Sequence, residues 1–138
     1  MPEEPGQKGN LYSVSVCFLV NDLVKSAEYY RDLFGFSFNR YWGEPPCFVM
    51  VQRGGVEFFF SNNGAKGNMR PNHIAFPDFT WDAYVRCHNV DALYQEFKAK
   101  GAQITREPED TLYEMKEFEV KDCNGYMLCF AQDVSAAP

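Results

Sequence analysis

Histidine is scarce in this sequence, and its cysteines lack the spacing of a metal site or a disulfide framework. The 138 residues include 2 His and 5 Cys, with no C-x-x-C pair. An odd number of cysteines excludes a framework in which every cysteine is paired within the chain, and the spacing argues against a zinc knuckle. We expect free thiols in a reducing, cytoplasmic environment.

Basic residues and long apolar runs are lacking as well. The 13 Lys and Arg stand against 19 Asp and Glu, a formal net charge of −6 at pH 7, which leaves no basic stripe for a phosphate backbone. No stretch approaches the roughly 18 apolar residues of a membrane span. The beginning of the chain lacks the basic and apolar regions of a signal peptide. These absences argue against nucleic-acid and membrane partners and predict a soluble protein.

Aromatic residues, in contrast, are abundant. They make up 17% of the chain, with 13 Phe and 8 Tyr. Most are expected in the core, but such side chains also form the walls of sites for flat or mixed apolar ligands. The length is that of one domain with a sizeable core.

The order of elements βαβββ is predicted twice along the chain. In the first half, an apolar and β-branched run at residues 11–20 predicts a strand, Asn21 and Asp22 begin a helix that Gly35 ends, and three short β-like runs follow. The second half repeats this order from "WDAYVRCHNV" and its helix "VDALYQEFKAKG". The predicted boundaries are a flexible tail at 1–10, a module at 11–61, a connector at 62–80, a module at 81–132 and a tail at 133–138.

The segments "VNDLVKSAEYYRDLFGF", "YVRCHNVDALYQEF" and "YEMKEFEVKDCNG" resemble the vicinal oxygen chelate superfamily over about residues 11 to 132. This superfamily includes glyoxalase I, extradiol dioxygenases, fosfomycin-modifying enzymes and bleomycin-resistance proteins, and the pattern is nearest to the last of these. The resemblance implies an α+β fold in which two βαβββ modules form a curved mixed sheet, the glyoxalase/bleomycin resistance fold. It also implies a homodimer with ligand grooves at the subunit interface.

Metalloenzymes of this superfamily hold a metal on the first and last strands of each module, usually through His and Glu. The resemblance places these positions here at Ser15, Phe59, Asp82 and Cys129. A register slip of two residues offers Cys17, Tyr84 or Glu57 instead. Neither register gives the three or more His or carboxylate ligands that a divalent metal site needs. We therefore expect no metal and no other cofactor, with Cys129 and Cys17 packed as small apolar side chains.

Aromatic and charged side chains within the predicted strands are the candidate ligand-binding residues. They are Phe38, Trp42, Phe48, Phe59, Asp82, Tyr84, Arg86 and Tyr113. Tyr113 matches a position where bleomycin-resistance proteins often carry a Trp that stacks on the drug. Asp82 and Arg86 are expected either to give the groove polar handles or to pair with each other or with surface charges. Core packing is the alternative for each aromatic residue, and Glu117 is expected to be structural rather than catalytic.

These residues favour a metal-free protein that binds a small aromatic or cationic compound, such as a bleomycin-like antibiotic, by stacking and burial without catalysis. The alternative is a lyase, isomerase or dioxygenase of the superfamily with a non-standard metal site, to which Asp82, Glu57 or His73 supplies ligands. A third interpretation is a module whose groove binds a protein or peptide. The sequence leaves open the identity of the ligand, any catalytic activity, and whether the dimer exchanges modules.

Overall fold

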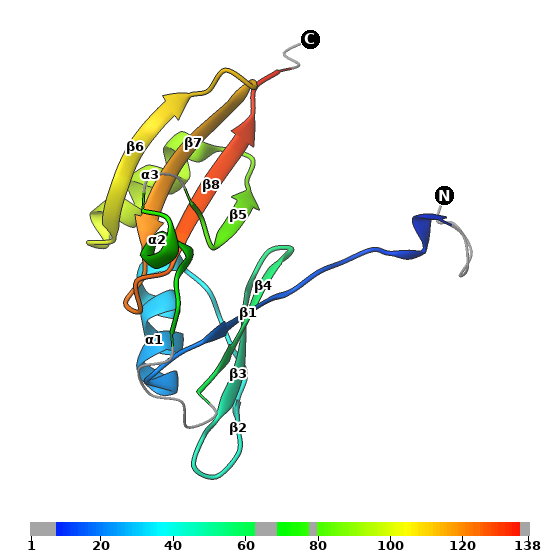
Figure 1. Cartoon of the computed structure of the whole chain (residues 1–138), viewed down its shortest axis with the longest axis vertical. Helices are drawn as coiled ribbons and strands as arrows, with labels where there is room; N and C mark the ends of the chain where they lie inside the picture. Colours follow the sequence, from blue (N-terminus) through cyan, green and yellow to red (C-terminus); the bar gives the residue numbers. More distant parts are fainter. Residues whose placement is uncertain (1–7, 63–68, 78–79, 136–138) are drawn as a thin grey trace.

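The structure of the protein, a computed structural model, describes residues 8–62, 69–77 and 80–135. Figure 1 shows its elements in space. In chain order they are the 3-10 helix η1 (Lys8–Asn10), β1 (Val16–Leu19), α1 (Leu23–Phe34), β2 (Tyr41–Trp42), β3 (Phe48–Arg53), β4 (Val56–Ser61), α2 (Asn72–Ala75), β5 (Ala83–Arg86), α3 (Val90–Ala99), β6 (Gln103–Asp110), β7 (Met115–Lys121) and β8 (Met127–Asp133). The predicted α+β class and the βαβββ order of both halves are confirmed.

Each module forms its own four-stranded mixed sheet. The strand orders are β1-β4-β3-β2 and β5-β8-β7-β6. In both sheets the first strand runs parallel to the last, and the other neighbours are antiparallel. Helix α1 packs on β3 and β4, and α3 packs on β6, β7 and β8 (Figure 1). We call the sheet faces opposite α1 and α3 the first open face and the second open face.

Alternation along the strands decides which side chains reach an open face. In β4, Phe58 and Phe60 are buried beneath α1, whereas Glu57 and Phe59 point to the first open face and are half-buried. The sequence "MKEFEVK" of β7 alternates in the same way and directs Glu117 to the second open face. The faces toward the helices therefore hold the apolar core, and the open faces hold the side chains that remain for binding.

The ends of α1 confirm the predicted capping residues Asp22 and Gly35. The Asp22 carboxylate accepts the Lys25 N–H over 3.0 Å at the start of α1, and Gly35 ends this helix with a φ of 74°. Asn89 caps α3 by accepting the Ala92 N–H over 3.0 Å. No helix in the described part of the chain is long and apolar enough to cross a membrane.

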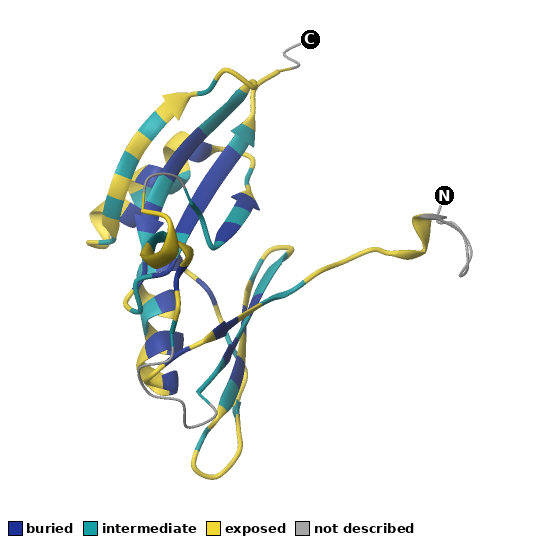
Figure 2. Ribbon diagram, in the orientation of Figure 1, coloured by how far each residue is buried: buried dark blue, intermediate teal, exposed yellow. Residues whose placement is uncertain are grey.

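The two modules share one hydrophobic core. Phe34 of α1 packs against Phe97 of α3 and Phe130 of β8, with ring centroids 5.0 and 6.5 Å apart. Tyr30 Oη of the first module donates a hydrogen bond to Asp122 Oδ2 of the second over 2.7 Å. Figure 2 shows buried segments along β7, β8 and one side of α1. Each buried Phe contributes about 1.5–3 kcal/mol relative to an exposed one, so burial is the main force that joins the modules.

Three predicted elements differ in extent from the structure. The first strand begins at Val16 instead of residue 11, because residues 11–15 extend beyond the sheet and pair with no described strand (Figure 1). The first of the three short β-like runs predicted after the first helix, "FSFNRYW", is reduced to the two-residue strand Tyr41–Trp42. The predicted connector contains a one-turn helix, Asn72–Ala75. Residues 63–68 and 78–79 of that connector, and parts of both predicted tails, lie outside the described residues.

Candidate ligand-binding site

A fully buried carboxylate lies on the second open face. Glu117 of β7 is 0% exposed. Its oxygens accept hydrogen bonds from Tyr84 Oη (2.6 Å), Tyr113 Oη (2.7 Å) and Arg106 Nη2 (2.8 Å). A buried charge is tolerated when it is paired and its lone pairs are satisfied. Donors from β5, from β6 and from the turn between β6 and β7 meet both conditions here.

Arg106 contacts three carboxylates at once. Besides its bond to Glu117, its Nε donates to Glu119 over 2.8 Å and its Nη1 donates to Glu109 over 2.6 Å. Glu119 also accepts a hydrogen bond from Trp81 Nε1 over 2.9 Å, which fixes the position of the indole. One guanidinium among three carboxylates leaves an excess of negative charge on this face.

Burial and hydrogen bonding determine the protonation states in this cluster. Burial acts to raise the pKa of Glu117, but the hydrogen bonds from Tyr84, Arg106 and Tyr113 outweigh it, and this pKa lies below its ordinary value. Burial and the hydrogen bond to Glu117 raise the pKa of Tyr113 to about 12, and the same causes raise the pKa of Tyr84. At neutral pH Glu117 is an anion and both tyrosines are protonated donors. Glu117 and the two tyrosines are thus suited to holding charge and hydrogen bonds rather than to transferring a proton at neutral pH.

These groups, except Tyr84, line a cavity of about 530 Å³, which we call the carboxylate pocket. It lies between the second open face, the turn that joins β6 to β7, and the connector. Its apolar and charged lining includes Pro77, Trp81, Leu112, Tyr113, Met127, Arg106, Glu109, Asp110, Glu117 and Glu119. The volume falls within the range of about 300–1,000 Å³ that is usual for small-molecule sites.

Two of the predicted ligand-binding residues, Tyr84 and Tyr113, meet around Glu117. Tyr84 is half-buried, and its ring lies 4.9 Å from the Trp81 ring. Tyr113 is 54% exposed and lies at the rim of the carboxylate pocket. Its ring is therefore accessible to a ligand while its hydroxyl holds the buried carboxylate.

Asp82 and Arg86, predicted as polar handles, lie elsewhere. The two oxygens of Asp82 accept the backbone N–H groups of Asn72 and Met127, both over 2.8 Å, so this carboxylate fixes the connector to the start of β8. The Arg86 guanidinium lies 5.4 Å from the centre of the Tyr84 ring. No ion pair joins Asp82 to Arg86. Neither side chain lines the carboxylate pocket.

The predicted residues of the first half gather on the first open face, except Phe38. The rings of Phe48 and Phe59 are 5.5 Å apart. Trp42 lies opposite Phe48, is 40% exposed and has the Arg40 guanidinium 3.7 Å from its ring centre. Phe38 packs against the edge of the core instead. The predicted set is thus divided between two separate faces of the chain.

The positions that the resemblance assigned to a metal do not fit one. Ser15 Oγ donates to Glu57 Oε1 over 2.7 Å, Phe59 has no ligand atom, and Asp82 is occupied by backbone donors. Cys129 is fully buried, as predicted, and burial followed by the nearby Glu117 and Glu119 charges raises the pKa of its thiol, which keeps it protonated. Within the described residues, no group of three or more His, Cys, Asp or Glu is arranged to hold a metal ion.

The register of the first strands differs from the predicted one. Cys17 lies opposite Phe59, and Tyr84 lies opposite Cys129. Ser15 lies beside Glu57, near the start of β4. Cys17, predicted to be buried, is exposed because its side chain points to the first open face. Cys17 and Tyr84, which the alternative register offered, are thus the cross-strand neighbours of Phe59 and Cys129.

Sequence reasoning missed Arg106, Glu119 and Trp81 as site residues and gave Glu117 only a structural role. The alternation in "MKEFEVK" was the available signal, because it places Glu117 and Glu119 on one face of a strand. The position of Arg106 opposite Glu119 depends on the pairing of β6 with β7, whose register shifts on both sides of Arg106. Such irregular pairing is not readable from the sequence.

The fold places two βαβββ modules in one chain, each with an open sheet face, and the second of these faces borders a cavity. The sequence pattern of the Glyoxalase/Bleomycin resistance protein/Dioxygenase superfamily matches residues 13–130. The chain belongs to this superfamily, as the resemblance indicated. No curated protein has a significantly similar sequence.

Solved structures share the fold at low sequence identity. TioX from Micromonospora sp. ML1 has a TM-score of 0.70 at 17% identity, covering 88% of this chain and 98% of that chain. TnmS3, an antibiotic binding protein from Streptomyces sp. CB03234, has a TM-score of 0.68 at 16% identity, covering 89% and 96%. A glyoxalase-related enzyme from Clostridium phytofermentans has a TM-score of 0.71 at 14% identity, covering 95% and 100%. Both binding proteins and enzymes thus share this fold.

Proposed function

We propose that the protein is a metal-free binding protein for a small, cationic and partly aromatic molecule, and that the carboxylate pocket is its binding site. The observation that carries this proposal is the charge of the described lining, in which four carboxylates outnumber the one guanidinium, that of Arg106. Trp81 and Tyr113 lie beside these charges and offer ring faces to a cation or to a second ring. Binding of this kind sequesters a compound in the cytoplasm without any catalytic group.

The comparisons support an antibiotic as the ligand class. TnmS3 is an antibiotic binding protein with the same fold, and the sequence pattern is nearest to the bleomycin-resistance type. Bleomycin-like compounds combine positive charge with flat rings, which is the chemistry that the carboxylate pocket favours. A role in antibiotic resistance follows from this proposal, and it rests on the pocket rather than on the fold, because one fold serves many functions.

The working form in this proposal is a homodimer. The first open face exposes Leu19, Trp42 and Met50, which are 37%, 40% and 37% accessible. Clustered apolar side chains on an uncovered sheet are typical of an interface. A second copy that placed its first open face over the carboxylate pocket would bring Phe48 and Phe59 to the same ligand. The two halves of the predicted residue set would then form one site.

The ligand class is tested by isothermal titration calorimetry with three probes. Bleomycin is titrated first, followed by 2-(2-naphthyl)ethylamine and the matched neutral alcohol 2-(2-naphthyl)ethanol. We expect the amine to bind about tenfold more tightly than the alcohol, since the ring is the same and only the charge differs. Equal affinity for amine and alcohol would contradict the cationic assignment.

A matched pair of variants locates the binding site. Glu119→Gln removes one negative charge from the pocket but keeps an oxygen that can accept hydrogen bonds from Trp81 and Arg106, and we expect about tenfold weaker binding of the amine. Glu107→Gln changes the same charge on β6 at an exposed position outside the pocket and should leave binding unchanged. An equal effect of the two substitutions would place the site elsewhere.

The metal-free part of the proposal has its own test. Elemental analysis of the purified protein, before and after incubation with Mn(II), Fe(II), Ni(II) and Zn(II), is expected to find each metal well below one equivalent per chain. A tightly held stoichiometric metal would overturn this part and favour a superfamily enzyme.

A further inference from the structure

The three carboxylates bonded to Arg106 use their oxygens unequally. Both oxygens of Glu117 are occupied, Oε1 by Arg106 and Oε2 by two tyrosine hydroxyls. Glu119 accepts hydrogen bonds only at Oε2, from Trp81 and Arg106. Glu109 accepts one only at Oε1, again from Arg106. One oxygen of Glu119 and one of Glu109 therefore accept no hydrogen bond from any described residue.

These two oxygens are open to the carboxylate pocket. Every buried side-chain nitrogen and oxygen of the described residues has a hydrogen-bond partner, so an oxygen without a partner is an exposed one. Glu109 and Glu119 both line the carboxylate pocket. Their side chains are 58% and 17% accessible. The pocket thus offers one acceptor at its rim, on Glu109, and one deeper in, on Glu119.

The pairing of β6 with β7 separates the two acceptors. Glu109 lies opposite Glu117, and Arg106 lies opposite Glu119. Residues two apart on a strand are about 7 Å apart and neighbouring strands about 5 Å, so the Cα atoms of Glu109 and Glu119 are about 8 Å apart. The guanidinium lies between them, with Nη1 toward Glu109 and Nε toward Glu119. The pocket therefore has two anionic acceptors on different sides of one cation.

The charges of this group do not cancel. Three carboxylates and one guanidinium leave a net charge of −2. A ligand with one positive charge would leave one negative charge unbalanced in a partly enclosed space, where charges interact more strongly than in water. A ligand with two positive charges would balance the group. The net charge of −6 on the whole chain favours the same ligand.

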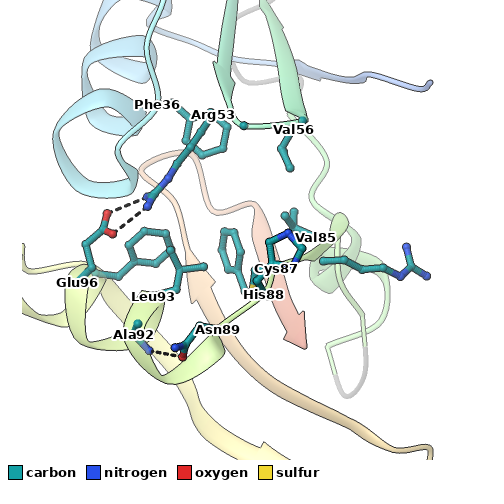
Figure 3. A pocket seen from close by; sticks show the side chains of 15 residues that line it. Phe36, Arg53, Val56, Val85, Cys87, His88, Asn89, Ala92, Leu93 and Glu96 are labelled. Atoms are coloured by element: carbon teal, nitrogen blue, oxygen red, sulfur yellow. Dashed lines mark hydrogen bonds and ion pairs between the residues drawn. The ribbon is translucent and has the colours of Figure 1, made fainter. Parts of the chain in front are cut away.

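The ion pair between the modules shows the opposite case. At a cavity of about 410 Å³ where the modules meet, Arg53 donates to both oxygens of Glu96 over 2.8 and 2.9 Å (Figure 3). One guanidinium there meets one carboxylate and leaves neither oxygen without a donor. The open acceptors of the carboxylate pocket are therefore not a general feature of the ion pairs in this chain.

We propose that the carboxylate pocket binds an aromatic dication, with one ammonium group at Glu119 beside Trp81 and the other at Glu109 on the rim. Each ammonium forms a charge-assisted hydrogen bond to the oxygen that is left open. The ring between them packs against Trp81 and Tyr113. This inference rests on the proposed function and narrows it from any cationic, partly aromatic molecule to one with a positive group at each end.

Two amines that share a ring test the number of charges. 1,4-Bis(aminomethyl)benzene carries two ammonium groups, and 4-methylbenzylamine carries one. Each is titrated into the full chain at pH 7 and followed by isothermal titration calorimetry. We expect the diamine to bind about fivefold more tightly, because this is the contribution of an additional ion pair at an exposed carboxylate.

A matched set of variants assigns the two ends of the ligand. Glu109→Gln removes the charge at the rim and keeps an oxygen for the Arg106 hydrogen bond, so the diamine should lose its advantage while the monoamine binds as before. Glu119→Gln should weaken both amines about tenfold, because both place an ammonium there. Glu107→Gln, on the same strand but outside the pocket, should change neither affinity.

Two results would overturn the dication and leave the cationic site in place. One is an affinity ratio of about two or less in the wild type, which two equivalent ends give without a second contact. The other is a diamine advantage that persists in a Glu109→Gln protein whose circular dichroism is that of the folded chain. Absence of binding by both amines would contradict the proposed function and this inference with it, so the two failures are distinguishable.

Discussion

The two open faces come from modules with the same order of elements, yet their chemistry is opposite. A row of neighbours across the first sheet consists of Cys17, Phe59 and Met50. A row across the second consists of Tyr84, Cys129, Glu119 and Arg106. The first row is apolar and partly exposed, whereas the second is charged and bonded internally. The repeated architecture fixes where side chains point, and the residues at those positions decide what each face does.

The difference also indicates which face needs a covering surface. The polar groups of the second open face satisfy one another, and the buried side-chain nitrogen and oxygen atoms of the described residues all have hydrogen-bond partners. The first open face leaves apolar surface in water, at a cost of about 25 cal/mol for each Å². We therefore infer that the second face keeps its shape alone and that the first gains stability from contact with another surface.

The largest expected effect is on the free energy of unfolding, when a central side chain of each open face is shortened to alanine. Glu117→Ala leaves Tyr84 and Tyr113 without an acceptor and Arg106 with one carboxylate fewer. We expect it to reduce the free energy of unfolding by about 3 kcal/mol. Phe59→Ala, on the half-buried first face, should cost about 1 kcal/mol. Urea denaturation at pH 7 measures both, and equal losses would show that the buried network is no more sensitive than an apolar face.

The second largest effect is expected on the association of two chains, when a charged side chain is placed on the first open face. Met50→Lys is expected to raise the dissociation constant of the proposed dimer about thirtyfold, or about 2 kcal/mol, because an unpaired ammonium would be buried at the proposed interface. Val24→Lys is the matched control, since Val24 has nearly the same exposure, 36% against 37%, but lies on α1. Sedimentation equilibrium measures both proteins. A dimer that tolerates lysine at position 50 would place the interface on another surface.

A smaller effect is expected in the pH dependence of stability. The pKa of Glu117 is lower in the folded protein than its ordinary value of 4.5. Its ionised form therefore contributes stability that is present above pH 4.5 and is lost as the pH falls through the folded pKa. Glu117→Gln removes this contribution. We expect the difference in unfolding free energy between wild type and variant to be largest near pH 7 and to shrink below pH 4.5.

The pKa of Asp122 is shifted in the opposite direction to that of Glu117. Burial raises its pKa above the ordinary value of 3.8 despite hydrogen bonds from Tyr30 and from the N–H groups of Tyr126 and Asn124. Its contribution to stability is present below pH 3.8 and is lost as the pH rises through the folded pKa. Relative to Asp122→Asn, wild type should therefore lose stability on going from pH 3 to pH 6. If the difference in unfolding free energy between wild type and variant changed with pH in the same direction for Glu117 and for Asp122, the environments assigned to them would be wrong.

The sequence was sufficient for features that depend on local patterns. Capping by Asp22 and Gly35 and the alternation of β4 are set by neighbouring residues, so the βαβββ order was predictable. The length of the first strand was not, because pairing of residues 11–15 depends on the extent of the opposite strand. Tertiary partners decide such boundaries.

The candidate site was predicted only in part for the same reason. Tyr84 and Tyr113 were identified because aromatic residues in strands are a recognisable signal. Arg106 was not, because charged residues in strands are usually solvated, and only the pairing of β6 with β7 brings its guanidinium to Glu117 and Glu119. A network of charges from different strands becomes visible only when the register is known.

Gly35 ends α1 and leaves room for a side chain that links the two helices. A methyl group at this position would lie 2.7 Å from Arg53 Nη1 and 3.2 Å from Glu96 Oε2. The same Arg53 nitrogen donates to the Phe34 carbonyl over 2.7 Å, so one guanidinium holds the last turn of α1 and the side of α3 together. Any larger residue would strain the left-handed backbone at this position and displace the Arg53 guanidinium from the Phe34 carbonyl and from Glu96. The missing side chain of Gly35 is thus the space in which one guanidinium ties the two modules to each other.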